Sequence, residues 1–194
     1  MPDQYDSFEQ LAQNESEGLD YRIRLESRSW SVVVIAPHGG WIEPGTSEIA
    51  QAIAGDDYSF YAFEGLRPNR PHGDLHITST RFDEPHALAL VASADIAISV
   101  HGLAEPDGAV LVGGLDIALR DAIGRALQQA GFEVHTQNHA FLATDGRNIC
   151  NRTARGNGVQ LEIPRQLRDQ LRADQSRLDS FAGAVRHAVF ALLS

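Results

Sequence analysis

The sequence predicts an α/β fold, built as a three-layer sandwich of a sheet between helices. Two runs of β-branched and small apolar residues, at 31–35 and 96–98, are typical of strands that are buried on both faces. Helical spacing of apolar residues separates such runs, and strands alternating with helices favour this layered architecture. No repeat, linker or low-complexity stretch divides the chain, which indicates one domain over residues 1–194.

In the first half of the chain, caps, alternation and turn residues define the expected elements. In order, we expect a short helix opened by a capping box at 7–10 and continuing to about Gln13, an edge strand at 21–25 and the buried strand at 31–36. A helix capped by Thr46-Ser47 and ending near Gly55 follows, and then an aromatic-rich strand at 59–64. A loop at 67–73 and a strand-like segment at 76–82 complete this half.

The second half continues the same alternation and closes with helices. In order, we expect a helix from Pro85 to about Ser93, the strand that ends at His101 and a strand at 109–112 paired beside it. A helix over 115–130 closed by Gly131 and a short strand at 133–136 follow. A long polar loop at 138–156, a strand at 159–163 and helical segments from Pro164 to Leu192 complete the chain.

Composition and charge exclude several function classes. The formal net charge is −10 at pH 7, and all 16 basic residues are arginine, so we expect no nucleic-acid partner. Neither a signal peptide nor an apolar run near the ~20 residues of a membrane span is visible, and we expect a cytoplasmic protein without membrane association. The single cysteine, Cys150, is expected to be a small buried hydrophobic residue.

Two histidines follow the buried strands, and each is followed by glycine. His38 and His101 therefore stand at the carboxyl ends of strands, where open α/β sheets bind ligands. A carboxylate shortly after His38 would complete a set of two histidines and one carboxylate for Zn²⁺, with one position open for water. Glu43, held in a turn by proline and glycine, is favoured over Glu48, whose charge suits a helix start. The sequence thus predicts a zinc hydrolase.

A metal-assisted hydrolase also needs a general base, and Glu162 is the candidate. This carboxylate interrupts the apolar strand 159–163, where an unpaired charge would cost several kcal/mol. A buried ion pair, an outward-facing edge residue or a polar pocket wall shared with Gln160 are the alternatives.

The polar loop before that strand offers groups for the substrate. Arg152, with the amide of Asn151 beside it, can bind a carboxylate or polarise the scissile carbonyl, although a loop arginine is more often a surface charge. His76 and His139 are possible pocket residues, and the other histidines outside the metal set are taken as structural or surface groups. A polyanionic substrate would require the loop arginines to converge on one face. These are Arg67, Arg70, Arg81, Arg147, Arg152 and Arg155.

Five segments together resemble the poly-γ-glutamate hydrolase family of bacteria and of bacteriophages of bacilli. They are HGGWIEPGTSE at 38–48, LHITSTRFDEP at 75–85, VHG at 100–102, NICNR at 148–152 and VQLEIP at 159–164, and the first is the most specific. The resemblance implies a zinc amidohydrolase with a carboxypeptidase-like mixed sheet. By matched position it implies zinc ligands His38, Glu43 and His101, with Glu162 as general base.

The expected substrate carries carboxylates and is a peptide or polymer, with poly-γ-glutamate the first choice. Asn151, His76 and Arg81 are assigned to binding it. Trp41 departs from the family, which usually has a small residue there, and a ring beside the metal would narrow the pocket. Two alternatives stay open: a zinc hydrolase of small N-acyl amino acids or aminoacyl esters, and a non-catalytic phage or host protein associated with nucleic acid.

Overall fold

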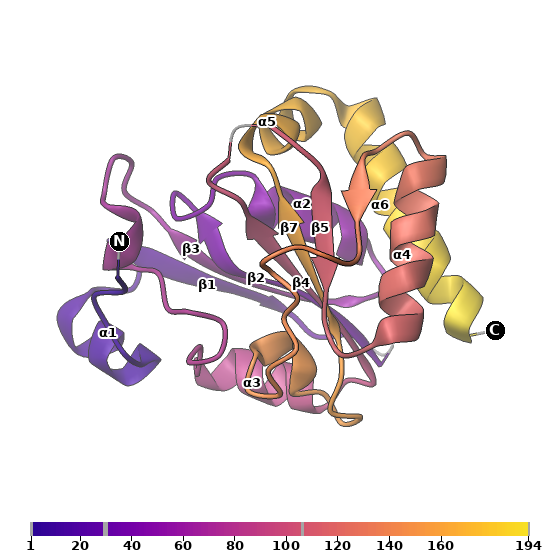
Figure 1. Ribbon diagram of the computed structural model, residues 1–194. Helices are drawn as coiled ribbons and strands as arrows, with labels where there is room; N and C mark the ends of the chain where they lie inside the picture. Colours follow the sequence, from indigo (N-terminus) through magenta and orange to yellow (C-terminus); the bar gives the residue numbers. More distant parts are fainter. Residues whose placement is uncertain (1, 29–30, 106, 194) are drawn as a thin grey trace.

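A seven-stranded mixed sheet forms the centre of the computed structural model, which describes residues 2–28, 31–105 and 107–193 (Figure 1). In spatial order its strands are β1 (Tyr21–Glu26), β3 (Ser59–Gly65), β2 (Val32–Gly40), β4 (Ile96–Gly102), β7 (Val159–Ile163), β5 (Val110–Gly113) and β6 (Val134–His135). The pairs β3–β2, β2–β4, β4–β7 and β5–β6 are parallel, whereas β1–β3 and β5–β7 are antiparallel.

Helices cover both faces of this sheet and confirm the three-layer sandwich. One face packs on α2 (Thr46–Ala54), α4 (Ile117–Gln129), α5 (Arg165–Ala173) and α6 (Gln175–Leu193). The other packs on α1 (Phe8–Asn14), α3 (Pro85–Ala92) and the short 3₁₀ helix η2 (Ile149–Asn151). In Figure 1, α4 and α6 lie side by side at the right, and α3 lies at the bottom. None of the described helices is long and apolar enough to cross a membrane.

Strand side chains alternate between the two cores, as the two-residue period of a strand requires. In β2, Val32 and Val34 belong to the core under α2 and α6, whereas Val33 and Ile35 belong to the core under α3. All four are at most 1% exposed. Burial on both faces is the reason that this strand is apolar at consecutive positions.

A β-bulge in β2 changes this alternation just before the site. Ala36 pairs with Ala62 of β3, but the next paired residue, Gly39, lies opposite Glu64, so β2 has one residue more than β3 in this interval. Ala36 belongs to the core under α2, yet the His38 ring packs against Phe82 on the opposite side of the sheet. The extra residue thus turns His38 onto the α3 face.

Polar side chains occupy the same face on the neighbouring strands. In the parallel pair β4–β7, Ser99 lies opposite Gln160 and His101 opposite Glu162. The residues between them belong to the core under α2 and α6, which places these four polar side chains on the other face. The carboxyl ends of β2, β4 and β7 therefore carry His38, His101 and Glu162 to one edge of the sheet.

Three expectations for the elements are wrong. The strand β5 pairs with β7 and β6 instead of β4, because β2 and β7 already occupy both edges of β4. Segment 76–82 is a turn, in which the Arg81 and Phe82 N–H groups both donate to the Thr78 carbonyl. The cap of α2 is Gly45 in the left-handed region, at φ 101°, and Thr46 lies inside the helix.

Candidate metal centre

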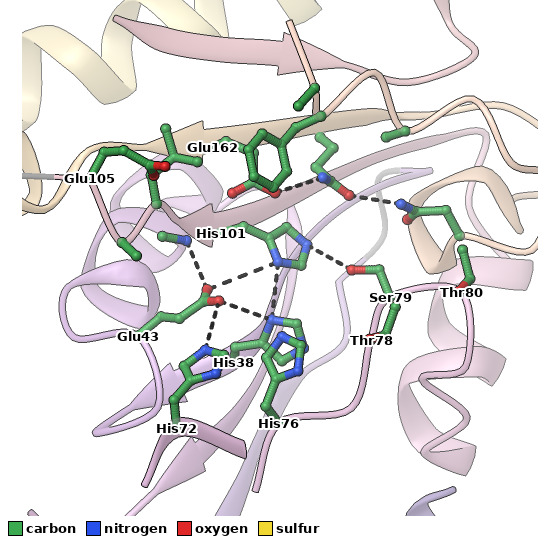
Figure 2. A pocket seen from close by; sticks show the side chains of 18 residues that line it. His38, Glu43, His72, His76, Thr78, Ser79, Thr80, His101, Glu105 and Glu162 are labelled. Carbon is green, nitrogen blue, oxygen red and sulfur yellow. Dashed lines mark hydrogen bonds and ion pairs between the residues drawn. The ribbon is translucent and has the colours of Figure 1, made fainter. Parts of the chain in front are cut away.

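A cavity of about 580 Å³ opens at the carboxyl ends of β2, β4 and β7 (Figure 2). His38, Glu43, His101 and Glu162 all line it, and Figure 2 shows their polar ends directed toward one another. Segments far apart in the sequence complete the wall, with residues from 72–80, 102–105 and 140–148. Three of the four polar groups are carried by strand ends, and Glu43 follows the end of β2 by three residues.

The spacing of the donor atoms of three residues fits a tetrahedral metal ion. His38 Nδ1 lies 3.1 Å from His101 Nδ1 and 3.4 Å from Glu43 Oε1, and His101 Nδ1 lies 4.0 Å from Glu43 Oε2. Ligands held 2.0–2.2 Å from a tetrahedral zinc ion are separated by roughly 3.4 Å. The residues present therefore fit a zinc ion.

A hydrogen bond of His38 determines which of its ring nitrogens is available to bind a metal ion. Its Nε2 lies 2.8 Å from the Ile77 carbonyl, which can only accept, so Nε2 carries the proton. In the neutral ring the lone pair is then on Nδ1, the atom that faces Glu43 and His101. Binding of the distal nitrogen to a backbone carbonyl is typical of histidines that ligate metals.

Electrostatics at the centre favour a cation. Burial lowers the pKa of His38, but the adjacent Glu43 carboxylate outweighs it and the pKa is raised overall. Burial also works against ionisation of Glu43, yet His38 holds the pKa of that carboxyl well below its usual range. Burial, followed by the charge of His38, lowers the pKa of His101 to about 3. Glu43 is thus ionised and the His101 imidazole is neutral, the protonation states that metal ligands require.

His76 provides a second set of donors with His38 and Glu43, whose ligand atoms all lie within 4.8 Å of one another. Its ring stacks on that of His38, with centroids 4.0 Å apart, and burial lowers its pKa to about 3. His72, which we expected to be structural or on the surface, also lines the cavity, and its Nε2 lies 3.6 Å from Glu43 Oε1. The glycine after His72 is the signal that marks it, as it marks His38 and His101.

Asp3 supports this wall from the amino-terminal segment. Its carboxylate accepts from Thr78 N and Oγ1, each at 2.8 Å, and binds His76 Nδ1 at 2.6 Å. Arg81 contacts the same carboxylate at 2.7 Å. More than 70 residues separate Asp3 from these partners, and no local pattern identifies it.

Glu162 is buried at the opposite wall, only 6% exposed. Its Oε1 accepts from Gln160 Nε2 at 2.7 Å, and Gln160 in turn accepts from Asn148 Nδ2 at 2.8 Å. Burial and the charge of Glu43 raise the pKa of Glu162 well above its usual range. No cation of the described residues pairs with it, and β7 is a central strand, so the ion-pair and edge-residue alternatives are excluded. A polar pocket wall and a general base both remain compatible with this position.

Three residues assigned to the substrate or to catalysis do not line the cavity. Arg152 donates to the carbonyls of Arg147, Thr80 and Phe82, at 2.7, 3.1 and 3.4 Å. The side-chain amide of Asn151 donates to the Ala143 and Asp145 carbonyls of the same loop and accepts from the Leu115 N–H, which precedes α4. Arg81 pairs with Asp3 and Asp6. These side chains brace the rim, because backbone groups and carboxylates already take up their donors.

The loop arginines do not converge on the cavity, and no arginine is among the described residues that line it. The four loop arginines other than Arg81 and Arg152 each form an ion pair with an acidic side chain. The pairs are Arg67 with Asp20; Arg70 with Glu15, Asp20 and Asp74; Arg147 with Asp145; and Arg155 with Asp95. His139 also lies outside the lining residues, with Nε2 3.3 Å from the Val112 carbonyl. Carboxylate recognition in the cavity would thus fall to histidines, hydroxyl groups and backbone N–H groups.

Trp41 does not narrow the cavity. Its side chain is 56% exposed and lines shallow hollows beside Gly65, outside the metal centre. The β-bulge and the glycine after it account for this position: a Cβ atom on Gly39 would lie 2.0 Å from Ser47 Oγ, so the chain packs tightly here and then turns outward. The ring is therefore available to solvent.

Cys150 gives a test of burial in the wall behind the site. It is fully buried, and burial raises the pKa of its thiol to about 12. Because the thiolate is the reactive form, the folded protein is expected not to react with a thiol-specific disulfide reagent at pH 8. The protein unfolded in urea is expected to react with one equivalent, since the chain has one cysteine. Reaction of the folded protein at the rate of the unfolded one would contradict this packing.

An α/β sandwich with buried histidine and glutamate donors at its strand ends, next to a second buried carboxylate, is the arrangement expected of a metal-dependent hydrolase. Comparison with known proteins supports a hydrolase. Residues 5–182 match the model of the poly-gamma-glutamate hydrolase family. The chain therefore belongs to the poly-γ-glutamate hydrolase family.

Individual relatives cover most of this chain. The SPbeta prophage-derived UPF0714 protein YoqZ of Bacillus subtilis (strain 168) is 42% identical over 172 residues, which are 87% of this chain and 61% of YoqZ. A solved bacteriophage poly-gamma-glutamate hydrolase superposes with a TM-score of 0.90 at 33% identity, over 98% of both chains. A solved apo, zinc-free form of YndL gives 0.88 at 35% identity, over 96% of this chain and 97% of the other. The match thus spans under two thirds of YoqZ.

Proposed function

We propose that this protein is a zinc-dependent amidohydrolase that cleaves γ-glutamyl-type amide bonds, with poly-γ-glutamate as the substrate. The observation that carries the proposal is the set of His38, Glu43 and His101 donor atoms, 3.1–4.0 Å apart, in one cavity with the buried Glu162. The name of the solved bacteriophage relative supports the substrate class, and the zinc-free description of the YndL structure supports zinc as the metal.

The mechanism assigns separate roles to the two walls of the cavity. His38, Glu43 and His101 would hold a zinc ion, which when bound polarises the scissile carbonyl and lowers the pKa of water. Glu162 accepts the proton of the attacking water and returns it to the nitrogen of the leaving amine. Its hydrogen bond from Gln160 occupies one carboxylate oxygen and fixes the direction of the other. A raised pKa suits a group that must both take and give a proton near neutral pH.

Recognition of the substrate carboxylate is proposed to involve the half-exposed His72 and the hydroxyl group of Ser79, which line the cavity. The absence of arginine among the described lining residues favours a second candidate, hydrolysis of small N-acyl amino acids or aminoacyl esters. Such substrates bear one carboxylate and need fewer cationic contacts than a polyanion.

A panel of substrates separates these proposals. Protein as purified is assayed for metal content and then incubated with γ-linked glutamate oligomers, α-linked glutamate oligomers of the same length and N-acetylated amino acids. Release of glutamate units from the γ-linked series alone, abolished by a chelator and restored by zinc, is the expected result. Turnover confined to the N-acetylated series supports the second candidate. Protein without bound transition metal, whose activity is indifferent to chelator, contradicts both.

A further inference from the structure

We propose that Arg168 is a positioning residue that holds together the three backbone segments carrying Glu43, His101 and Glu162, two of the metal ligands and the general base. This inference rests on the proposed function. Arg168 lies near the start of α5 and is only 3% exposed. It is not among the residues that line the cavity, so its effect on the site must pass through the groups it contacts.

Each guanidinium nitrogen of Arg168 donates to a different segment. Nε donates to the Ile163 carbonyl at 3.0 Å, and Nη2 donates to the Leu103 carbonyl at 2.9 Å. Nη1 donates to the Pro44 carbonyl. The planar, five-donor guanidinium is the side chain suited to bridging three acceptors at once.

These three carbonyls belong to residues one or two positions after the functional residues in sequence. Pro44 follows Glu43, and Ile163 follows Glu162. Leu103 follows Gly102, the residue after His101, and the Gly102 N–H donates to Glu43 Oε2 at 2.7 Å. Arg168 therefore binds the backbone one residue after Glu43 and Glu162 and two residues after His101, in the turn after β2, at the end of β7 and just after β4.

The backbone around Arg168 leaves space for its guanidinium group. A Cβ atom on Gly102 would lie 2.5 Å from Arg168 Cζ, so the glycine after His101 makes room for this side chain. Among the described residues no carboxylate forms an ion pair with Arg168. A buried cation without an ion pair costs stability unless hydrogen bonds compensate, and a nonpolar side chain would fill the same volume without that cost. The arginine is thus best explained by the three contacts it makes.

The test compares zinc affinity in Arg168→Lys and Arg168→Met with that of the wild type, measured by competition with a chromophoric chelator. A lysine ammonium cannot reach three carbonyls, so both variants are expected to bind zinc about 10–100-fold more weakly, the usual cost of losing an outer partner of a metal site. With saturating zinc, kcat is expected to fall while KM changes little. The lysine variant retains the positive charge, and its zinc affinity provides the test if the methionine variant does not fold.

Arg186→Lys is the matched control. Arg186 Nη1 donates to the Ile53 and Ala54 carbonyls, at 3.0 and 2.8 Å, at the end of α2 remote from Glu43. This variant is expected to lower the melting temperature and to keep the zinc affinity of the wild type. Wild-type zinc affinity in both Arg168 variants, or equal losses in the Arg168 and Arg186 variants, would overturn the inference. A wild type that binds no zinc contradicts the proposed function itself, and the inference with it.

Discussion

Glu162→Gln is expected to retain zinc and to lose turnover by about 10²–10⁴-fold, the usual effect of removing a general base. The amide keeps the size and hydrogen-bonding geometry of the carboxylate, but it cannot accept a proton at neutral pH. The residue lies opposite the donor set and is not one of the donors that surround the proposed zinc position. Zinc content and kcat of the purified variant are the two measurements.

The comparison variant is Glu43→Gln, which replaces a buried, ionised ligand with a neutral amide. It is expected to lose zinc, because an amide oxygen is a far weaker ligand than a carboxylate. Comparison of the two glutamine variants therefore separates ligand from base. A metal-free Glu162→Gln, or a Glu43→Gln that is replete with metal and inactive, would reverse the two assignments.

His38→Ala and His101→Ala are each expected to lose most of the bound zinc. Removal of a direct ligand should exceed the roughly 10–100-fold loss of affinity that an outer partner costs. The exposed His187 on α6 provides the control, and His187→Ala is expected to bind zinc as the wild type does. Metal analysis after dialysis against a weak chelator is the measurement.

His76→Ala decides between the two donor sets that share His38 and Glu43. If His101 is the third ligand, His76→Ala is expected to keep its zinc, with a moderate loss of affinity because the His76 ring stacks on His38. If His76 is the ligand, its alanine variant loses zinc and His101→Ala keeps it. That second result would move the site toward the 72–80 wall and away from Glu162.

Much of the fold could be predicted from local sequence. The strand 159–163 has the bounds expected for it, and β2 and β4 lie where apolar runs indicate them, because burial on both faces leaves a strong pattern. The partner of β5 could not be predicted in this way. Pairing depends on which sheet edges are free, and that is decided by segments distant in the sequence. Segment 76–82 has the composition of a strand but forms a turn, because its apolar residues Ile77 and Phe82 are buried anchors of a loop.

In the site, too, some features follow from local sequence and others depend on segments distant in the sequence. His38, Glu43, His101 and Glu162 lie at or just after strand ends, so their meeting in one cavity followed from the parallel sheet. Their chemical roles remain predictions. Arg152 and Arg81 were assigned to substrate because arginine binds carboxylates, but carbonyls and carboxylates from distant segments take up their donors. Asp3 and Arg168 act through long-range contacts that no spacing or motif discloses.

The additional residue in β2 makes the direction of the His38 side chain depend on how the strand is paired as well as on its composition. In unbroken alternation His38, two residues after Ala36, would share the α2 face with it, in an apolar interior. A change that forced Pro37 and His38 into regular pairing with β3 would therefore keep every donor type in the sequence and still remove one from the cavity. In comparing relatives, the two-residue step from the end of the apolar run to the first histidine has to be interpreted together with the bulge, and the histidine alone does not mark a working site.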